Sequence, residues 1–107
     1  MANGMSPHRI RIVPIDGGAD VRALIQHPME TGTRKDPVSG KTIPRHFIQE
    51  LSCEHSGIEV MHAYWSWGMA INPFLSIHIQ RVQAGDVIRV RWIDNTGLGE
   101  SLEGVVQ

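Results

Sequence analysis

The fold is decided by the stretch FIQELSCEHSGIEVMHAYW, residues 47–65. Two runs of alternating apolar side chains, Phe47–Cys53 and Ile58–Trp65, flank Ser56-Gly57, which is typical of two antiparallel strands joined by a two-residue turn. Both faces of this hairpin carry apolar side chains, whereas a strand of a sandwich normally buries one face and exposes the other. The pattern therefore predicts that one face covers a core and that the other contacts a protein partner.

A two-residue turn at Ser56-Gly57 pairs Cys53 with Val60 and places Cys53, His55 and His62 on one face, with diagonal neighbours about 7 Å apart. A Cys/His group of this kind on a small β-sandwich is typical of superoxide-reductase-type iron centres, so a mononuclear metal redox protein is an alternative function. The chain has no HxH, HExxH or CxxC spacing, and most of that face is aliphatic. We therefore expect no metal, no other cofactor and no catalytic residue.

Five further runs alternate apolar and polar side chains with the period of a strand. Glycine, proline, asparagine and aspartate separate the runs, as expected of turns. About seven short strands in a chain of this length favour an all-β fold, an antiparallel immunoglobulin-like β-sandwich, with a small barrel as the alternative. The five runs are residues 9–12, 21–26, 75–80, 88–92 and 102–106.

The length and charge of the chain narrow the classes of function. The 107 residues are expected to form one domain, residues 1–107, with residues 1–6 as a loose terminus. Ten Lys and Arg against 11 Asp and Glu argue against a general nucleic-acid surface. No apolar run approaches the roughly 20 residues that span a membrane, and residues 1–13 lack the apolar stretch of a signal peptide. Cys53, the one cysteine, is expected to be a small buried side chain.

Three segments of the chain resemble the SoxZ family. The first and longest begins His27-Pro28-Met29-Glu30-Thr31-Gly32-Thr33-Arg34-Lys35-Asp36 and continues to Glu50, and the others are Asn72-Pro73-Phe74 and residues 85–97. The resemblance implies a non-catalytic subunit that pairs with a SoxY-type carrier protein, whose C-terminal cysteine holds thiosulfate-derived sulfur. It also implies transient docking of other Sox enzymes, and export to the periplasm together with a signal-bearing partner. Residues 103–107 lack the Gly-rich, cysteine-bearing arm of the carrier, so we expect this chain to be the other subunit.

Candidate contact residues follow from the first of these segments and from the hairpin. Methionine offers an adaptable apolar surface, paired cations attract anionic groups, and aromatic side chains are enriched at interfaces. If the partner face is vacant, the isolated chain is expected to form a homodimer; a generic immunoglobulin-like adhesion module is a further alternative. The candidate partner-binding residues are His27, Met29, Glu30, Arg34, Lys35, Ile48, Met61, Trp65, Trp67 and Phe74.

Overall fold

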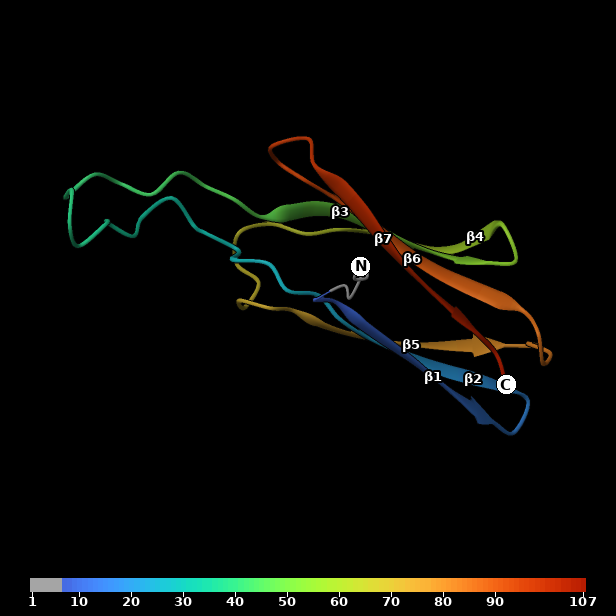
Figure 1. Cartoon of the computed structure of the whole chain (residues 1–107). Helices are drawn as coiled ribbons and strands as arrows, with labels where there is room; N and C mark the ends of the chain where they lie inside the picture. The colour runs from blue at the N-terminus through green and yellow to red at the C-terminus, as the bar shows by residue number, and fades with distance from the viewer. Residues whose placement is uncertain (1–6) are drawn as a thin grey trace, which may run out of the picture.

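The computed structural model describes residues 7–107, which form seven strands in two antiparallel sheets (Figure 1). The expectation of a loose terminus at residues 1–6 lies outside the described residues. Within residues 7–107 there is no helix, and so none that is long and apolar enough to cross a membrane. The strands are β1 (Arg9–Ile15), β2 (Gly18–Leu24), β3 (Ile48–His55), β4 (Ile58–Tyr64), β5 (Phe74–Gln80), β6 (Val87–Asp94) and β7 (Gly99–Val105).

The order of the strands is that of an immunoglobulin-like sandwich. One sheet has the order β1-β2-β5 and the other the order β4-β3-β6-β7. In a constant-type domain the fourth strand pairs with the sheet of the first two strands. Here β4 pairs with β3 instead, so the second sheet gains an edge strand. The predicted all-β sandwich of seven strands is confirmed.

The β3–β4 hairpin has the predicted turn but a different register. Ser56 and Gly57 have φ angles of 49° and 85°, as a tight two-residue hairpin turn requires. A β-bulge between Cys53 and Glu54 shifts the pairing beyond the turn. Cys53 therefore pairs with Met61, and the predicted pairing with Val60 is wrong because the bulge inserts one residue into β4.

The core lies between the two sheets and is built from alternate residues of β2, β3 and β6. The outward residues of β3 are polar, because a second irregularity between Ile48 and Glu50 brings both Ile48 and Leu51 to the core. The predicted second apolar face is thus absent from β3, and within the hairpin the exposed apolar side chains lie on the edge strand, β4. The largest fully buried apolar side chains are Val21, Ile25, Ile48, Leu51, Ile88 and Val90.

The two edges of the sandwich differ. At one edge β1 lies against β7, where a Cβ on Gly104 would be 2.7 Å from Cδ1 of Ile12, so a side chain at position 104 would have to displace the end of the Ile12 side chain. The strand order puts β4 and β5 at the other edge. There the side chains of Met61, Leu75 and Ile77 pack against the core but stay half-buried. We call this edge, with the exposed Ile58, Val60 and Tyr64 of β4, the open flank.

A long connection between β2 and β3 projects from one end of the sandwich (Figure 1, cyan to green). We call residues 28–45 the arm. Its two segments run antiparallel and are linked by isolated bridges between Glu30 and His46 and between Lys35 and Thr42. The arm has no sheet of its own, so its position depends on these bridges and on the contacts at its base.

Candidate functional site

The single cysteine lies in the core and is poorly suited to chemistry. Cys53 is fully buried among apolar residues of both sheets. Burial, and to a smaller extent the charge of Glu54, raises the pKa of its thiol to about 11. The thiolate is the reactive form of cysteine, so a reactive cysteine needs a lowered pKa and access to solvent. Cys53 has neither, which rules it out as a sulfur carrier in the folded chain.

The Cys/His group considered above is not assembled. His62 lies on the exposed side of β4, where its ring nitrogens are 2.7 Å from Glu59 Oε1 and 3.4 Å from Glu50 Oε1. His55 Nε2 instead contacts Asp86 Oδ2 at 2.7 Å. The prediction that Cys53, His55 and His62 share a face is therefore wrong, because the bulge turns His62 away from the core.

The structure brings together a different group at the base of the arm, which we call the clasp: His27, His46 and Asp94. Asp94 Oδ2 lies 3.3 Å from His27 Nε2 and 2.8 Å from His46 Nε2. Its Oδ1 accepts the backbone N–H groups of Thr96 at 2.9 Å and of Leu98 at 3.1 Å. Sixty-seven residues separate His27 from Asp94, so the clasp joins the end of β2 to the end of β6.

The pKa values of Asp94 and His27 in the clasp are both shifted from their ordinary values. Burial of Asp94 would raise its pKa, but hydrogen bonds from Thr96, His46, His27 and Leu98 outweigh burial and hold the pKa well below its ordinary value. Burial lowers the pKa of His27, although Asp94 opposes this effect. The clasp therefore joins an ionised carboxylate to a His27 that is neutral at neutral pH.

The donor set of the clasp does not fit a metal ion. Within residues 7–107, His27, His46 and Asp94 form the one cluster of His, Cys, Asp or Glu side chains whose potential ligand atoms all lie within 4.8 Å of one another. The Met29 backbone N–H donates to His27 Nδ1 at 3.1 Å, so the ring proton of neutral His27 sits on Nε2 and points at Asp94. A metal-bound histidine normally donates its other N–H to an acceptor, the reverse of this arrangement. The clasp is a structural hydrogen-bond centre.

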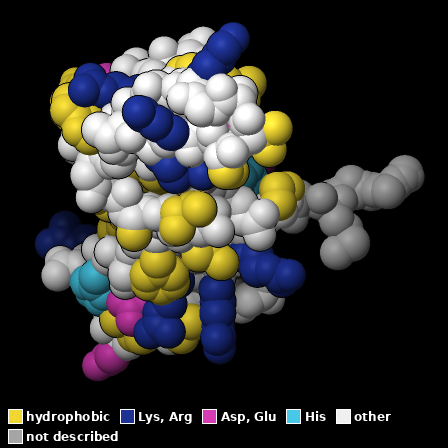
Figure 2. Space-filling model, turned by 90° about the vertical axis from the view of Figure 1, so that its left-hand side faces the viewer, with side chains coloured by type: hydrophobic (Ala, Val, Ile, Leu, Met, Phe, Trp, Pro, Cys, Tyr) yellow, Lys and Arg dark blue, Asp and Glu magenta, His cyan; other side chains and the backbone are white. Residues whose placement is uncertain are grey.

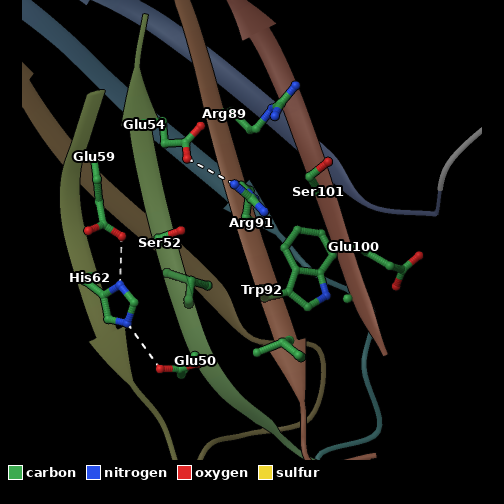
Figure 3. A pocket seen from close by; sticks show the side chains of 13 residues that line it. Glu50, Ser52, Glu54, Glu59, His62, Arg89, Arg91, Trp92, Glu100 and Ser101 are labelled. Atoms are coloured by element: carbon green, nitrogen blue, oxygen red, sulfur yellow. Dashed lines mark hydrogen bonds and ion pairs between the residues drawn. The ribbon is translucent and has the colours of Figure 1, made fainter. Parts of the chain in front are cut away.

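A shallow hollow on the outward face of the β4-β3-β6-β7 sheet is lined by charged side chains (Figure 3). Arg91 pairs with Glu54 at 3.2 Å, and Arg89 Nε donates to Glu103 at 2.8 Å. His62 lies between Glu59 and Glu50, and the hydrogen bond to Glu59 is the main cause that raises its pKa. The lining holds four glutamates, Glu50, Glu54, Glu59 and Glu100, against Arg89, Arg91 and His62, so these pairs leave the hollow with an excess of acidic groups on a solvated sheet face.

The predicted contact residues fall into three places. Three are buried and hold the chain itself: Met29 Sδ, for example, accepts the backbone N–H of Ile48 at 3.4 Å. Met29, His27 and Ile48 thus face the interior of the folded chain, and their role in partner binding stays a prediction. Glu30, Met61 and Trp65 are half-buried. The exposed residues of the set are Arg34, Lys35, Trp67 and Phe74.

Trp67 and Arg45 support the arm from the side of the sandwich. The guanidinium of Arg45 lies 4.0 Å from the centre of the Trp67 ring, and Trp67 packs edge-on against Phe47 with ring centres 5.7 Å apart. Arg45 Nε also donates to the carbonyl oxygen of Thr31 at 3.1 Å. These contacts tie the arm to the connection between β4 and β5.

Sequence reasoning missed several exposed apolar residues. They lie on β4, on the connection that follows it and at the tip of the arm. The exposure of one of them could have been predicted: Val38 lies inside the turn sequence Asp-Pro-Val-Ser-Gly, and turns lie at the surface. The most exposed of these residues are Val38, Ile58, Tyr64 and Ile71.

The chain matches the model of a known family. The model of the family described as "Sulphur oxidation protein SoxZ" matches residues 13–103 of the chain. That range includes all seven strands in whole or in part, the arm and the clasp. No curated protein matches the chain.

Proposed function

The chain belongs to the SoxZ family of sulfur oxidation proteins, and from this we propose its function. It would bind a SoxY-type carrier protein as the non-catalytic subunit of a carrier complex. The C-terminal cysteine of that partner would hold thiosulfate-derived sulfur as a covalent adduct during bacterial thiosulfate oxidation. Other Sox enzymes would dock transiently on the complex. We further propose that the complex works in the periplasm, after export with the signal-bearing partner.

The observation that carries this proposal is the burial of Cys53. A sulfur carrier needs a thiol that is exposed and easily ionised, so that successive enzymes can reach the bound sulfur. The one cysteine of this chain is enclosed by the core, and its pKa is raised to about 11 by that burial. In a sulfur-carrying complex that contains this chain, the carrier thiol must therefore come from the partner.

The open flank is the surface that we assign to the carrier protein. Its edge strand β4 pairs only with β3 within residues 7–107, and it exposes apolar side chains beside half-buried core residues of β5. Apolar side chains at an unpaired edge favour association, because a partner can complete both the core and the hydrogen bonding of the strand. Without the partner, the same flank would support a homodimer.

The experiment compares two aspartate substitutions in the tagged chain, purified from its host. Val60 on β4 is 46% exposed and Val105 on β7 is 49% exposed, and both strands are edges of the same sheet. Val60→Asp is expected to reduce co-purification of the carrier protein at least 10-fold, whereas Val105→Asp leaves it unchanged, because a charge is costly only where it becomes buried. Equal recovery with both variants would exclude the open flank, and recovery of no carrier protein by the wild-type chain would exclude the proposed function.

A further inference from the structure

The arm is built to hold a fixed shape although it has no core. The backbone N–H of Ile43 donates to the carbonyl of Arg34 at 2.8 Å, and that of Asp36 donates to the carbonyl of Lys41 at 2.8 Å. Arg34 closes the first segment on itself with two hydrogen bonds to the Glu30 carboxylate. Beyond Met29, which is buried at its base, the arm has little buried apolar surface, so its ordering depends on local hydrogen bonds and on the clasp.

The tip of the arm presents one apolar side chain to solvent. Asp36 Oδ1 accepts the backbone N–H groups of Val38 at 2.7 Å and of Ser39 at 3.1 Å, which fixes the turn. Val38 is 95% exposed, the highest exposure among the large apolar side chains of the described residues. Pro37 restricts the turn further because its ring sets φ. The turn thus holds the apolar group of Val38 at the far end of the hydrogen-bonded arm.

Cationic side chains surround this tip. Lys35 and Lys41 stand on either side of the turn, both are exposed, and neither forms an ion pair within residues 7–107. The arm contains four cationic residues and two acidic ones, although the whole chain has a net charge of −1. Figure 2 views the molecule from the end where the arm projects, and Lys, Arg and hydrophobic side chains are more prominent there than Asp and Glu. Positive charge is therefore concentrated on the arm.

We propose that the tip of the arm docks into an apolar hollow rimmed by Asp and Glu on a protein other than the carrier subunit. Val38 would fill the hollow, while Lys35 and Lys41 would meet the acidic rim. The arm is already ordered, so little conformational entropy is lost on docking, and the lysines accelerate encounter with an acidic surface. This inference rests on the carrier complex of the proposed function, but the arm and the open flank involve different residues, so failure of the contact at the tip leaves the carrier contact untouched.

A second copy of the chain is a poorer fit for the tip. The acidic side chains of its sheet hollow already have partners: Glu54 pairs with Arg91 and Glu59 with His62 on the same sheet, and Glu100 pairs with His8. Docking of a lysine there would have to displace a pair that already exists. A partner with an acidic rim of its own meets the lysines without that cost.

The test is site-directed photocross-linking from the tip. In a Val38→Cys variant the new thiol is exposed, whereas Cys53 is buried and its thiol pKa is raised to about 11, so a benzophenone maleimide labels the tip selectively. The labelled protein, purified from its host with its retained partners, is mixed with the soluble proteins of that host and irradiated. Mass spectrometry identifies the cross-linked protein and the attachment site.

Charge variants decide whether the contact is specific. Lys35→Glu/Lys41→Glu reverses the charge of the tip, and Arg9→Glu/Arg11→Glu changes the net charge equally on β1, where both arginines are exposed. We expect one main protein, cross-linked at apolar residues among Asp and Glu, with a yield that falls at least 10-fold in the lysine variant and is unchanged in the arginine variant. Attachment to the carrier subunit or to a second copy of this chain, no attachment, or equal loss in both variants would overturn the proposal.

Discussion

The sandwich and the arm are held in place by different forces. The sandwich buries alternating apolar side chains of β2, β3 and β6 between its sheets. The arm buries little and is fixed by backbone hydrogen bonds and by the clasp. The residues that stabilise the chain are thus largely separate from those that face solvent on the arm and the open flank. We infer that the contact surfaces can change without unfolding the sandwich, and the predictions below test that separation.

The largest effect is expected at the joint between the two regions. Asp94→Ala removes the acceptor of His27, His46, Thr96 and Leu98, and leaves the buried His27 and three partly buried donors without that partner. A buried donor left without its partner costs about 1–3 kcal/mol, and more when the lost acceptor was charged, and Asp94 accepts from several groups. Urea unfolding measures this cost, and Asp94→Asn, which keeps one carbonyl acceptor, is expected to lose less. An Asp94→Ala variant as stable as wild type would show that the clasp does not hold the joint.

A smaller effect is expected inside the sandwich. Gly104→Leu would force a side chain into the space of Ile12, where a Cβ already comes within 2.7 Å of Cδ1. Overpacking of this kind costs about 1–3 kcal/mol. Ser101→Leu on the same strand is the control, because Ser101 is exposed and its replacement should change stability by less than about 0.5 kcal/mol. Equal stability of the two leucine variants would mean that β1 and β7 are not closely packed.

The stability of the joint is expected to decrease as the pH is lowered. Burial lowers the pKa of His27 in the folded chain. As the pH falls below about 6.5, His27 of the unfolded chain binds a proton more readily than His27 of the folded chain, and this favours unfolding. Asp94 acts in the same direction at lower pH, because its folded pKa is also below its ordinary value. His62 acts oppositely, since its pKa is raised and its contribution is lost as the pH rises.

Thermal unfolding between pH 7.5 and pH 5 measures this slope. His27→Asn, whose amide oxygen can still accept the Met29 N–H, is expected to flatten the loss of stability on acidification relative to wild type. A His27→Asn profile parallel to that of wild type would show that His27 does not titrate differently in the folded and unfolded chains.

The smallest effect on stability is expected at the tip of the arm. Val38→Asp replaces a side chain that is 95% exposed, so the free energy of unfolding should change by less than about 0.5 kcal/mol. The photocross-linker can be attached at Ser39→Cys instead of at position 38. In that labelled chain, Val38→Asp should abolish the cross-link to the docking protein. A destabilised Val38→Asp chain, measured by urea unfolding, would contradict the separation of stability from contact.

The sequence predicts the strands well because alternation is a local property. The runs at residues 75–80 and 88–92 lie within β5 and β6, and the turn at Ser56-Gly57 joins β3 to β4 as expected. The register beyond that turn is not predictable from alternation, since a single bulge reverses which face His62 occupies. Local patterns therefore locate elements but do not fix the faces of their side chains.

The clasp escaped prediction for a different reason. His27 and His46 are far from Asp94 in the sequence, and no spacing rule connects them. Only the fold brings the ends of β2, β3 and β6 together. The burial of Met29 could not be predicted either, because it depends on the path of the arm base, and methionine is common both in cores and on contact surfaces.

The most direct test of the central claim is intact-mass and peptide mass spectrometry on the complex purified from cells oxidising thiosulfate. We predict a heterodimer in which sulfur adducts are confined to a cysteine of the partner, and in which Cys53 carries none because the core encloses it. Sulfur adducts on Cys53 of the folded chain would contradict the account, and would make this chain the carrier.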